Sequence, residues 1–290
     1  MTNSEDARKV ADIRIREIAG PVEIRAVEEL QKEVWGIPDL DVVPLTQLIA
    51  AANAGGSLLG AFDSSSLVGF AYGFVGFEHG RTTHHSHMLA VRKANRNLDI
   101  GYRLKLAQRD LVLRQGIQEM TWTFDPLQSL NANFNFGRLG VISNTYLADF
   151  YGFDSSSPLH RSGTDRLWVT WELSSPRVEE WLLGAKPLRK LRNAVTIVEV
   201  GSDGSPRSHD PILEAGVDLA YIEIPGDISS IEQQDPDLSK QWRLSTRRSF
   251  INAFEAGFVA EDFLREERGE AIVGKYLLSR TARQDQTNET

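Results

Sequence analysis

The chain contains no cysteine among its 290 residues. Disulfide bonds, thiolate metal ligands and a catalytic thiol are therefore excluded. The sequence also lacks any run of about 18 consecutive apolar residues, the length that crosses a bilayer. Its N-terminal residues show no apolar core of a signal peptide. We accordingly expect a cytoplasmic protein with no membrane partner.

Positive charge is also scarce, because 32 Lys and Arg stand against 40 Asp and Glu, a formal net charge of −8. Proteins that bind nucleic acid usually carry extended basic surfaces, so we expect no nucleic-acid partner. Basic residues nevertheless gather in one stretch: Arg92, Lys93, Arg96, Arg103, Lys105 and Arg109. Such a local cluster suits a small polyanionic ligand, and a solvated helix face is the alternative interpretation.

Hydrophobic periodicity predicts an α/β (α+β layered) architecture, with a mixed central sheet flanked by helices. The expected strands of the first part are 12–17, 57–62, 67–77, 82–91, 117–124, 141–150 and 166–173. The expected helices are 22–35, 45–53, 99–114 and 127–139. Beyond these, we expect helices at 177–183 and 238–256 and strands at 195–200, 219–224, 258–265 and 273–278.

These elements predict two domains. The first spans residues 12–174, and a smaller α+β domain spans 194–280. A helix and basic linker, 175–193, join them, and the polar tails 1–11 and 281–290 are expected to be flexible. On the long second-domain helix, Arg243 and Arg247 share one face because they are four residues apart. We expect that face to contact the first domain.

The stretch from Met88 to Lys105 reads as an apolar strand, a polar and basic loop, and an amphipathic helix. A helix N-terminus presents N–H groups and a positive dipole end to its surroundings. This order therefore favours an anionic ligand in the loop. Asn97 and Asp99 belong to residue types that tolerate unusual φ, and Asp99 can also cap the helix. Gly101 lets a ligand approach the backbone closely.

The spacing Arg96-Asn97-Leu98-Asp99-Ile100-Gly101 resembles the Arg/Gln-x-x-Gly-x-Gly/Ala loop of the GNAT acetyltransferase superfamily. Asp99 fills one of the two small-residue positions. The segments 85–91, 121–127, 131–135 and 164–166 with Trp171 resemble one uncharacterised branch of predicted acetyltransferases, which also carries a C-terminal extension. The resemblance implies that the loop cradles the pyrophosphate of acetyl-CoA or another acyl-CoA. It implies coenzyme contacts at Leu89, Ala90, Val91, Arg96, Asn97, Leu98, Asp99, Ile100, Gly101 and Asn131.

The resemblance further implies that an amine attacks the thioester directly, assisted by a base and an acid. By the two-residue period of a strand, His85 and His87 project to one side and His84 to the other. Histidine titrates near neutrality, so His87 is the first candidate base and His85 the second. A hydrogen-bonded, half-buried histidine is the alternative for each. Asp125, at a strand end, is a further candidate or else a cap before a proline.

The family's acid is a tyrosine on the short helix, and the corresponding residue here is Phe136. Tyr151 or Tyr146 is expected to take over, unless water does or the chemistry has lapsed. We expect no metal site, because His85 and His87 lack an evident third ligand.

We therefore expect an N-acyltransferase that moves a short acyl group to a small amine, such as an amino acid if Arg166 faces the cleft. The alternative is a non-catalytic protein of the same fold that senses a metabolite or binds a partner. A homodimer is compatible with the sequence, which defines neither the oligomeric state nor the acceptor.

Overall fold

The computed structural model describes residues 12–152, 163–185, 194–209 and 216–280. These residues form two compact units. Unit 1 holds the described residues up to Trp122, and unit 2 holds those from Thr123 onward. The predicted tails and the linker segment 186–193 lie outside the described residues. The predicted domain boundaries stay predictions.

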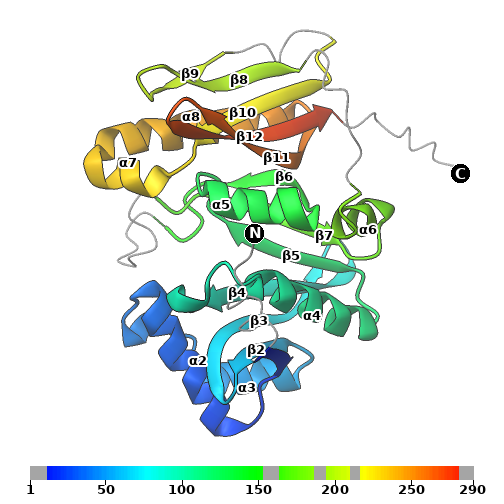
Figure 1. The fold of residues 1–290 in the computed structure, drawn as a ribbon. Coiled ribbons are helices and arrows are strands. Elements are labelled where there is room, and N and C mark those ends of the chain that lie inside the picture. Colours follow the sequence, from blue (N-terminus) through cyan, green and yellow to red (C-terminus); the bar gives the residue numbers. More distant parts are fainter. Residues whose placement is uncertain (1–11, 153–162, 186–193, 210–215, 281–290) are drawn as a thin grey trace, which may run out of the picture. The chain divides into compact units, whose positions relative to one another are not determined.

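Unit 1 contains five strands in the order β1-β2-β3-β4-β5, counted over its described residues (Figure 1). Its elements are β1 (Ile13–Glu17), α2 (Gly20–Trp35), η1 (Asp39–Asp41), α3 (Leu45–Asn53), β2 (Ser57–Asp63), β3 (Ser66–Glu78), β4 (Arg81–Val91), η2 (Lys93–Asn95), α4 (Ile100–Arg114) and β5 (Glu119–Phe124). The last two residues of β5 belong to unit 2. Neighbouring strands are antiparallel from β1 to β4, whereas β4 and β5 are parallel.

The two faces of β3 explain how helices cover this sheet. Phe70 and Tyr72 lie on one face and pack in a core with residues of α2 and α3, among them Leu30. Glycines occupy the opposite face, which meets α4. A Cβ atom on Gly73 would lie 3.0 Å from Nε2 of Gln108 on α4. The small residues therefore let α4 pack closely on the sheet.

Unit 2 contains the other strands of the described chain, in the order β7-β6-β11-β12-β10-β8-β9. Its elements are α5 (Ser129–Ala132), η3 (Asn133–Leu139), β6 (Ile142–Leu147), β7 (Arg166–Glu172), α6 (Pro176–Leu182), β8 (Val195–Val200), β9 (Pro206–Ser208), β10 (Leu219–Pro225), α7 (Ile228–Gln234), α8 (Pro236–Glu255), β11 (Phe258–Arg268) and β12 (Ala271–Arg280). Neighbouring strands are mostly antiparallel, with β8 and β10 parallel. The predicted α/β class, a mixed sheet flanked by helices, is confirmed.

Three local predictions need correction. The helix expected over 127–139 is a short α-helix, α5, followed by a π-helix, η3, whose hydrogen bonds span one residue more than those of an α-helix. The turn-rich stretch 201–210, for which no strand was predicted, contains the short strand β9 (Pro206–Ser208). The helix α7 was not expected, although Asp227 caps it by accepting from the N–H of Ser230 at 3.0 Å.

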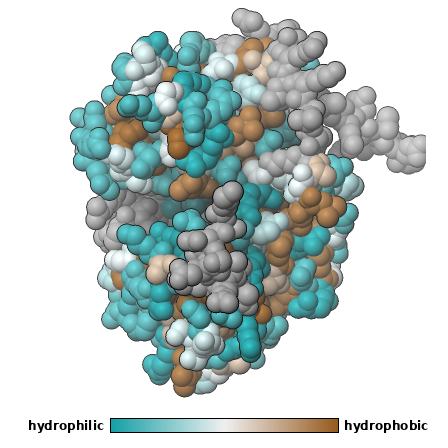
Figure 2. Space-filling view, in the orientation of Figure 1, coloured by the Kyte–Doolittle hydropathy of each residue, from teal (hydrophilic) through white to brown (hydrophobic). Residues whose placement is uncertain are grey.

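The face of the protein shown in Figure 2 is mainly hydrophilic, with hydrophobic residues interspersed. Large apolar side chains that are exposed occur in both units, among them Phe77 of β3 and Leu130 of α5. None of the described helices is both long and apolar enough to cross a membrane.

Candidate functional site

The parallel pairing of β4 with β5 is short. It consists of His84 opposite Met120 and His85 opposite Thr121. In contrast, β4 stays paired with β3 as far as Val91. Between Tyr72 and Phe74 the β3–β4 register shifts, so β4 carries an extra residue there, as in a β-bulge. The segment predicted to bind the coenzyme, Leu89 to Val91, thus lies in the part of β4 that pairs with β3. In the described register, this part of β4 no longer pairs with β5.

The loop after β4 contains two non-glycine residues in the left-handed region, Asn97 (φ 69°) and Asp99 (φ 55°). Asp99 is the N-cap residue of α4, and its carbonyl accepts from the N–H of Arg103 at 3.0 Å. Its side chain makes no capping hydrogen bond, contrary to the predicted cap. The left-handed backbone of Asp99 explains this difference, because a residue whose side chain caps a helix normally has extended φ and ψ.

The basic cluster is less concentrated than the sequence indicates. Arg92 forms an ion pair with Glu33 of α2 at 2.8 Å, and Arg103 donates to the carbonyl of Ile13 at 2.7 Å. Lys105 is buried. The cationic side chains that are exposed on the loop are Lys93 and Arg96. These two remain beside the N-terminus of α4, where an anion is favoured.

The candidate bases lie on one face of β4. The ring of Phe74 lies 5.4 Å from that of His85 and 5.7 Å from that of His87, measured between centroids. His87 also contacts Tyr72 at 6.0 Å. His84 points to the opposite face, toward α4. Strand alternation predicted this placement, and the catalytic roles stay predictions.

A chain of buried polar side chains connects β2, β4 and α4. Lys105 Nζ donates to Oγ of Ser86 at 2.7 Å, and the Ser86 hydroxyl donates to Oε1 of Gln108 at 2.8 Å. Nε2 of Gln108 then donates to Oγ of Ser57 at 2.8 Å, and that oxygen lies 2.9 Å from Nε2 of His84. Since buried polar groups are costly unless hydrogen-bonded, this chain fixes the position of α4 on β4.

The ammonium of Lys105 ends this chain. It lies 3.6 Å from the centroid of the Trp122 ring, within the range of a cation–π contact. Burial lowers the pKa of Lys105 well below its usual value. The sequence placed Lys105 in the surface cluster that attracts an anion, and the structure corrects this by placing it in the interior.

Burial also controls the histidines. It lowers the pKa of His84 to about 4, with a further contribution from the charge of Lys105. Burial lowers the pKa of His85 to about 4 as well, helped by the charges of His87, Lys105 and His84. An unfolded histidine binds a proton below about pH 6.5. Between pH 6.5 and 4 the unfolded chain therefore holds more protons than the folded one, so stability falls as the pH falls.

We expect the free energy of unfolding to decrease through this window, by up to about 3 kcal/mol for the fully buried His84. Urea denaturation at a series of pH values from 7 down to about 4 measures the profile. His84→Asn is expected to flatten it, whereas His79→Asn, at an exposed left-handed position of unit 1, is the control. An equally steep profile in His84→Asn would contradict the assignment.

The remaining predicted residues lie in unit 2. The carboxylate of Asp125 forms a bidentate ion pair with Arg243, with distances of 2.6 and 2.8 Å, and also accepts from the N–H of Leu127. Tyr151 is exposed and lies under the guanidinium of Arg166, 5.1 Å from its ring centroid. Asn131 is exposed on α5. Their predicted roles are untested by this placement.

The two other positions considered for the acid are Phe136, which is buried, and Tyr146, which is half-buried. Phe136, at the position of the family's acid, is fully buried in η3. The hydroxyl of Tyr146 donates to Oδ2 of Asp165 at 2.6 Å, and burial together with that carboxylate raises the pKa of Tyr146 well above its usual value. Tyr146 is therefore a poor proton donor.

Asp165 anchors a second ionic cluster that sequence reasoning did not resolve. Arg247 donates to both of its oxygens, at 2.9 and 2.6 Å, and to both oxygens of Asp149, at 2.9 and 2.8 Å. Burial alone would raise the pKa of Asp165. The hydrogen bonds that it accepts from Arg247, from the N–H of Asp149 and from Tyr146 outweigh burial, so the pKa lies below its usual value. Arg243 and Arg247 share one face of α8, and their ion pairs tie that face to Asp125, Asp149 and Asp165 within unit 2.

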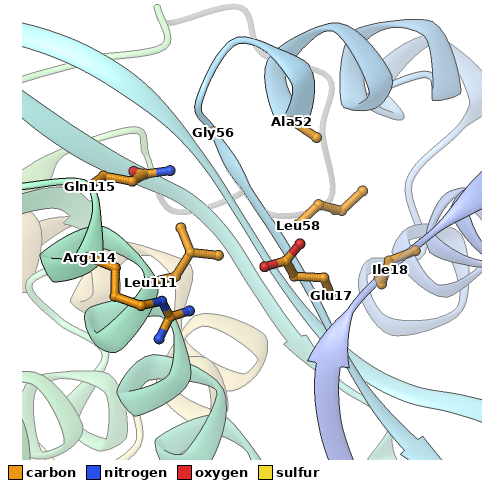
Figure 3. Close-up of a pocket in the computed structure, with 8 residues that line it drawn as sticks. All are labelled: Glu17, Ile18, Ala52, Gly56, Leu58, Leu111, Arg114 and Gln115. Carbon is orange, nitrogen blue, oxygen red and sulfur yellow. The ribbon is translucent and has the colours of Figure 1, made fainter.

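A hollow of about 270 Å³ opens elsewhere in unit 1 (Figure 3). It is lined by Glu17, Ile18, Ala52, Gly56, Leu58, Leu111, Arg114 and Gln115. Its charged side chains, Glu17 from β1 and Arg114 from α4, are both exposed. None of the predicted site residues lines it. Over the described ranges, no three His, Asp or Glu side chains gather as metal ligands would.

Comparison by sequence finds no matching family model and no matching curated protein. Among solved structures, the chain is similar to Ard1 from Thermoplasma volcanium, at 17% identity and a TM-score of 0.43, over 55% of this chain and 96% of that one. It is also similar to Arabidopsis thaliana Naa50 in complex with a bisubstrate analogue, at 16% identity and a TM-score of 0.44, over 55% of this chain and 97% of that one. A third similar structure is an aminoglycoside 6'-N-acetyltransferase complexed with coenzyme A, at 18% identity and a TM-score of 0.42, over 56% of this chain and 98% of that one.

Proposed function

We propose that unit 1 binds an acyl-CoA along β4 and at the N-terminus of α4, and that the protein is a GNAT-type N-acyltransferase acting on a small amine. The observation that carries the proposal is the end of the β4–β5 pairing at His85 and Thr121. Beyond that pair β4 continues to Val91, and it leads into a loop with two left-handed residues and a helix N-terminus. The sequence resemblance of 85–101 to the same superfamily supports this assignment.

The residues at this place fit the coenzyme. The first hydrogen bond of α4 starts at the N–H of Arg103, so the N–H groups of Ile100 and Gly101 have no acceptor within the helix. A Cβ atom on Gly101 would come no closer than 3.7 Å to the atoms of other elements, the nearest being a methyl carbon of Leu89 on β4. The protein's own packing therefore does not require glycine here, whereas a phosphate approaching the backbone does. Lys93 and Arg96 add positive charge nearby.

The histidine face of β4 supplies the chemistry. When bound, the coenzyme supplies an activated acyl carbonyl. His85 is neutral at physiological pH, because burial lowers its pKa to about 4. A neutral imidazole offers a lone pair to the ammonium proton of the acceptor, and the transfer requires that the imidazolium be stabilised as it forms. The rings of Tyr72 and Phe74 beside the histidines favour a cationic group at this face. We therefore propose a small amine as the acceptor. Separately, we propose that the protein acts in the cytoplasm.

The structure gives less support to an amino-acid acceptor. That expectation depended on Arg166, which is buried, donates to the carbonyl of Asp165 at 2.8 Å and lies over the ring of Tyr151. Its guanidinium is thus already engaged within unit 2. We leave the carboxylate out of the proposed acceptor.

A non-catalytic role is the second candidate. It is favoured by Phe136, which has no hydroxyl at the family's acid position, and by the engaged hydroxyl of Tyr146. In the first candidate, water protonates the departing thiolate. In the second, the site binds the coenzyme or a related metabolite without transferring a group.

Calorimetric titration with acetyl-CoA, succinyl-CoA and free CoA tests the proposal. We expect micromolar binding of acetyl-CoA, followed by acyl transfer when amines are added. Asp99→Gly is expected to bind about fivefold more tightly, because it removes a carboxylate whose repulsion of a phosphate near the surface is worth about 1 kcal/mol. Asp110→Asn, exposed near the other end of α4, is the control.

The outcomes separate the candidates. Binding with no transfer to any amine would favour the non-catalytic protein. Absence of binding by both the wild type and Asp99→Gly would contradict the acyltransferase and favour a non-catalytic protein that binds another metabolite or a partner.

A further inference from the structure

A single hydroxyl connects His85 to a carboxylate. Nδ1 of His85 lies 3.1 Å from Oγ1 of Thr121. The hydroxyl of Thr121 donates to Oε1 of Glu78 at 2.8 Å, and Thr83 contributes a longer hydrogen bond to the same oxygen, at 3.3 Å. Glu78, His85 and Thr121 come from β3, β4 and β5, so the connection crosses three neighbouring strands of unit 1. It lies at the last residue pair before β4 and β5 part.

The direction of these hydrogen bonds fixes the position of the proton on His85. A carboxylate only accepts, and a threonine hydroxyl has one proton to give. That proton goes to Glu78, so the Thr121 oxygen must accept from Nδ1–H of His85. A neutral imidazole carries one N–H. Nε2 of His85 is therefore the nitrogen with the lone pair.

We propose that Glu78 and Thr121 are positioning residues that hold His85 in its Nδ1–H form, so that Nε2 removes the proton from the acceptor ammonium. This inference rests on the proposed acyl transfer. Carboxylates and carbonyls play the same role for histidines in other sites, where the partner of one nitrogen sets the state of the other. The resulting imidazolium would be stabilised by Glu78 through the Thr121 hydroxyl.

The hydrogen bond between His85 and Thr121 also separates the two candidate bases. Among the described residues, the ring of His87 contacts Tyr72, Phe74 and His85 and makes no hydrogen bond that would select one tautomer. His87 is also the more exposed of the two. The sequence puts His87 first, whereas the hydrogen-bond geometry favours His85.

The step balances as follows. Nε2 takes one proton from R–NH₃⁺, and the freed amine nitrogen forms a bond to the thioester carbonyl carbon. The C–S bond breaks, the nitrogen loses its second proton, and the thiolate takes up a proton to leave as the thiol. The imidazolium returns its proton to water. The net products are an amide, free CoA and one proton.

The titrating groups around His85 come from three elements. His84 and His87 flank it on β4, Glu78 faces it from β3 through Thr121, and Lys105 on α4 contributes its charge. Burial is the largest influence and lowers the pKa of His85 to about 4. The ring is thus uncharged throughout the physiological range, and the hydrogen-bond relay from Glu78 through Thr121 to His85 decides which of its nitrogens carries the lone pair.

Nitrogen-15 NMR of protein labelled at histidine tests the relay with no coenzyme present. At neutral pH we expect the His85 proton on Nδ1, with the signals assigned by their loss in His85→Gln. Thr121→Val keeps the side-chain shape but removes the acceptor, so the two tautomers are expected to mix. Thr121→Ser retains the hydroxyl and should restore the Nδ1–H form. Thr82→Val, at an exposed position of β4, is the matched control.

A proton on Nε2 in the wild type, or an unchanged tautomer in Thr121→Val, would overturn the inference. Kinetics supply the second arm. We expect kcat to fall 10²–10⁴-fold in His85→Gln and about tenfold or more in Thr121→Val, with KM for acetyl-CoA unchanged and Thr121→Ser near wild type.

The two arms fail separately. Wild-type protein with the expected tautomer but no acyl transfer would contradict the proposed function and leave the relay as a structural feature only. A normal kcat in Thr121→Val, despite a mixed tautomer, would overturn the positioning role while the acyltransferase stands. A larger loss in His87→Gln than in His85→Gln would assign the base to His87.

Discussion

Arg243→Met is expected to lower the free energy of unfolding by about 3–5 kcal/mol, the usual cost of leaving one partner of a buried ion pair uncompensated. The side chain of Arg243 is only 5% exposed and that of Asp125 only 14%. Both oxygens of Asp125 are bound by the guanidinium, at 2.6 and 2.8 Å. Removing Arg243 therefore leaves a largely desolvated carboxylate without its counter-ion. Chemical denaturation followed by circular dichroism measures the loss.

Two variants make this prediction specific. Arg248→Met, on an exposed face of the same helix, is expected to change stability by no more than about 0.5 kcal/mol. The double variant Arg243→Met with Asp125→Leu removes both charges and is expected to recover much of the loss, because replacing a whole buried pair is often neutral. Equal losses in Arg243→Met and Arg248→Met would contradict the structural importance of the pair.

Gly101→Ala is expected to change stability and coenzyme binding in opposite directions. The alanine Cβ would meet only Leu89 and Val91, at 3.7 and 4.0 Å, and these are ordinary contacts. Within a helix, alanine is favoured over glycine by about 1 kcal/mol, so thermal stability should rise. Acetyl-CoA binding is expected to weaken tenfold or more, because the methyl group occupies the space through which a phosphate reaches the backbone N–H groups.

Calorimetry and thermal denaturation of the same preparation measure both effects. Asp110→Ala, near the end of α4, raises helix propensity away from the loop and should stabilise the protein without changing affinity. Unchanged acetyl-CoA affinity in Gly101→Ala would contradict the proposal that the coenzyme phosphates bind the backbone N–H groups at Gly101.

Sequence reasoning located most of the elements because their signals are local. The expected helix 45–53 and strand 195–200 coincide with α3 and β8. The alternation of β4 likewise placed His85 and His87 on one face. The signals were weaker where an element is short, as for β9 and α7. In α7, the clue that went unused is Asp227, a residue type that commonly caps helices.

The pairings that build the sites were beyond sequence reasoning, because they join residues far apart in the chain. Asp125 and Arg243 are 118 positions apart, and Glu78 and Thr121 are 43 apart. The sequence offers many acidic partners for each arginine and many hydroxyls for each histidine. Only the strand order brings Glu78 and Thr121 to either side of β4. Lys105 was misplaced for a related reason, since its partner Ser86 lies on another element.

The most direct test of the account is hydrogen exchange of the backbone amides with and without acetyl-CoA. We predict slower exchange at Leu89 to Val91 and at Arg96 to Gly101 on binding, with little change at the hollow around Arg114 that Figure 3 shows. Slowing confined to this strand and loop would support coenzyme binding along β4 and at the N-terminus of α4. Unchanged exchange in both segments at saturating acetyl-CoA would contradict the central claim.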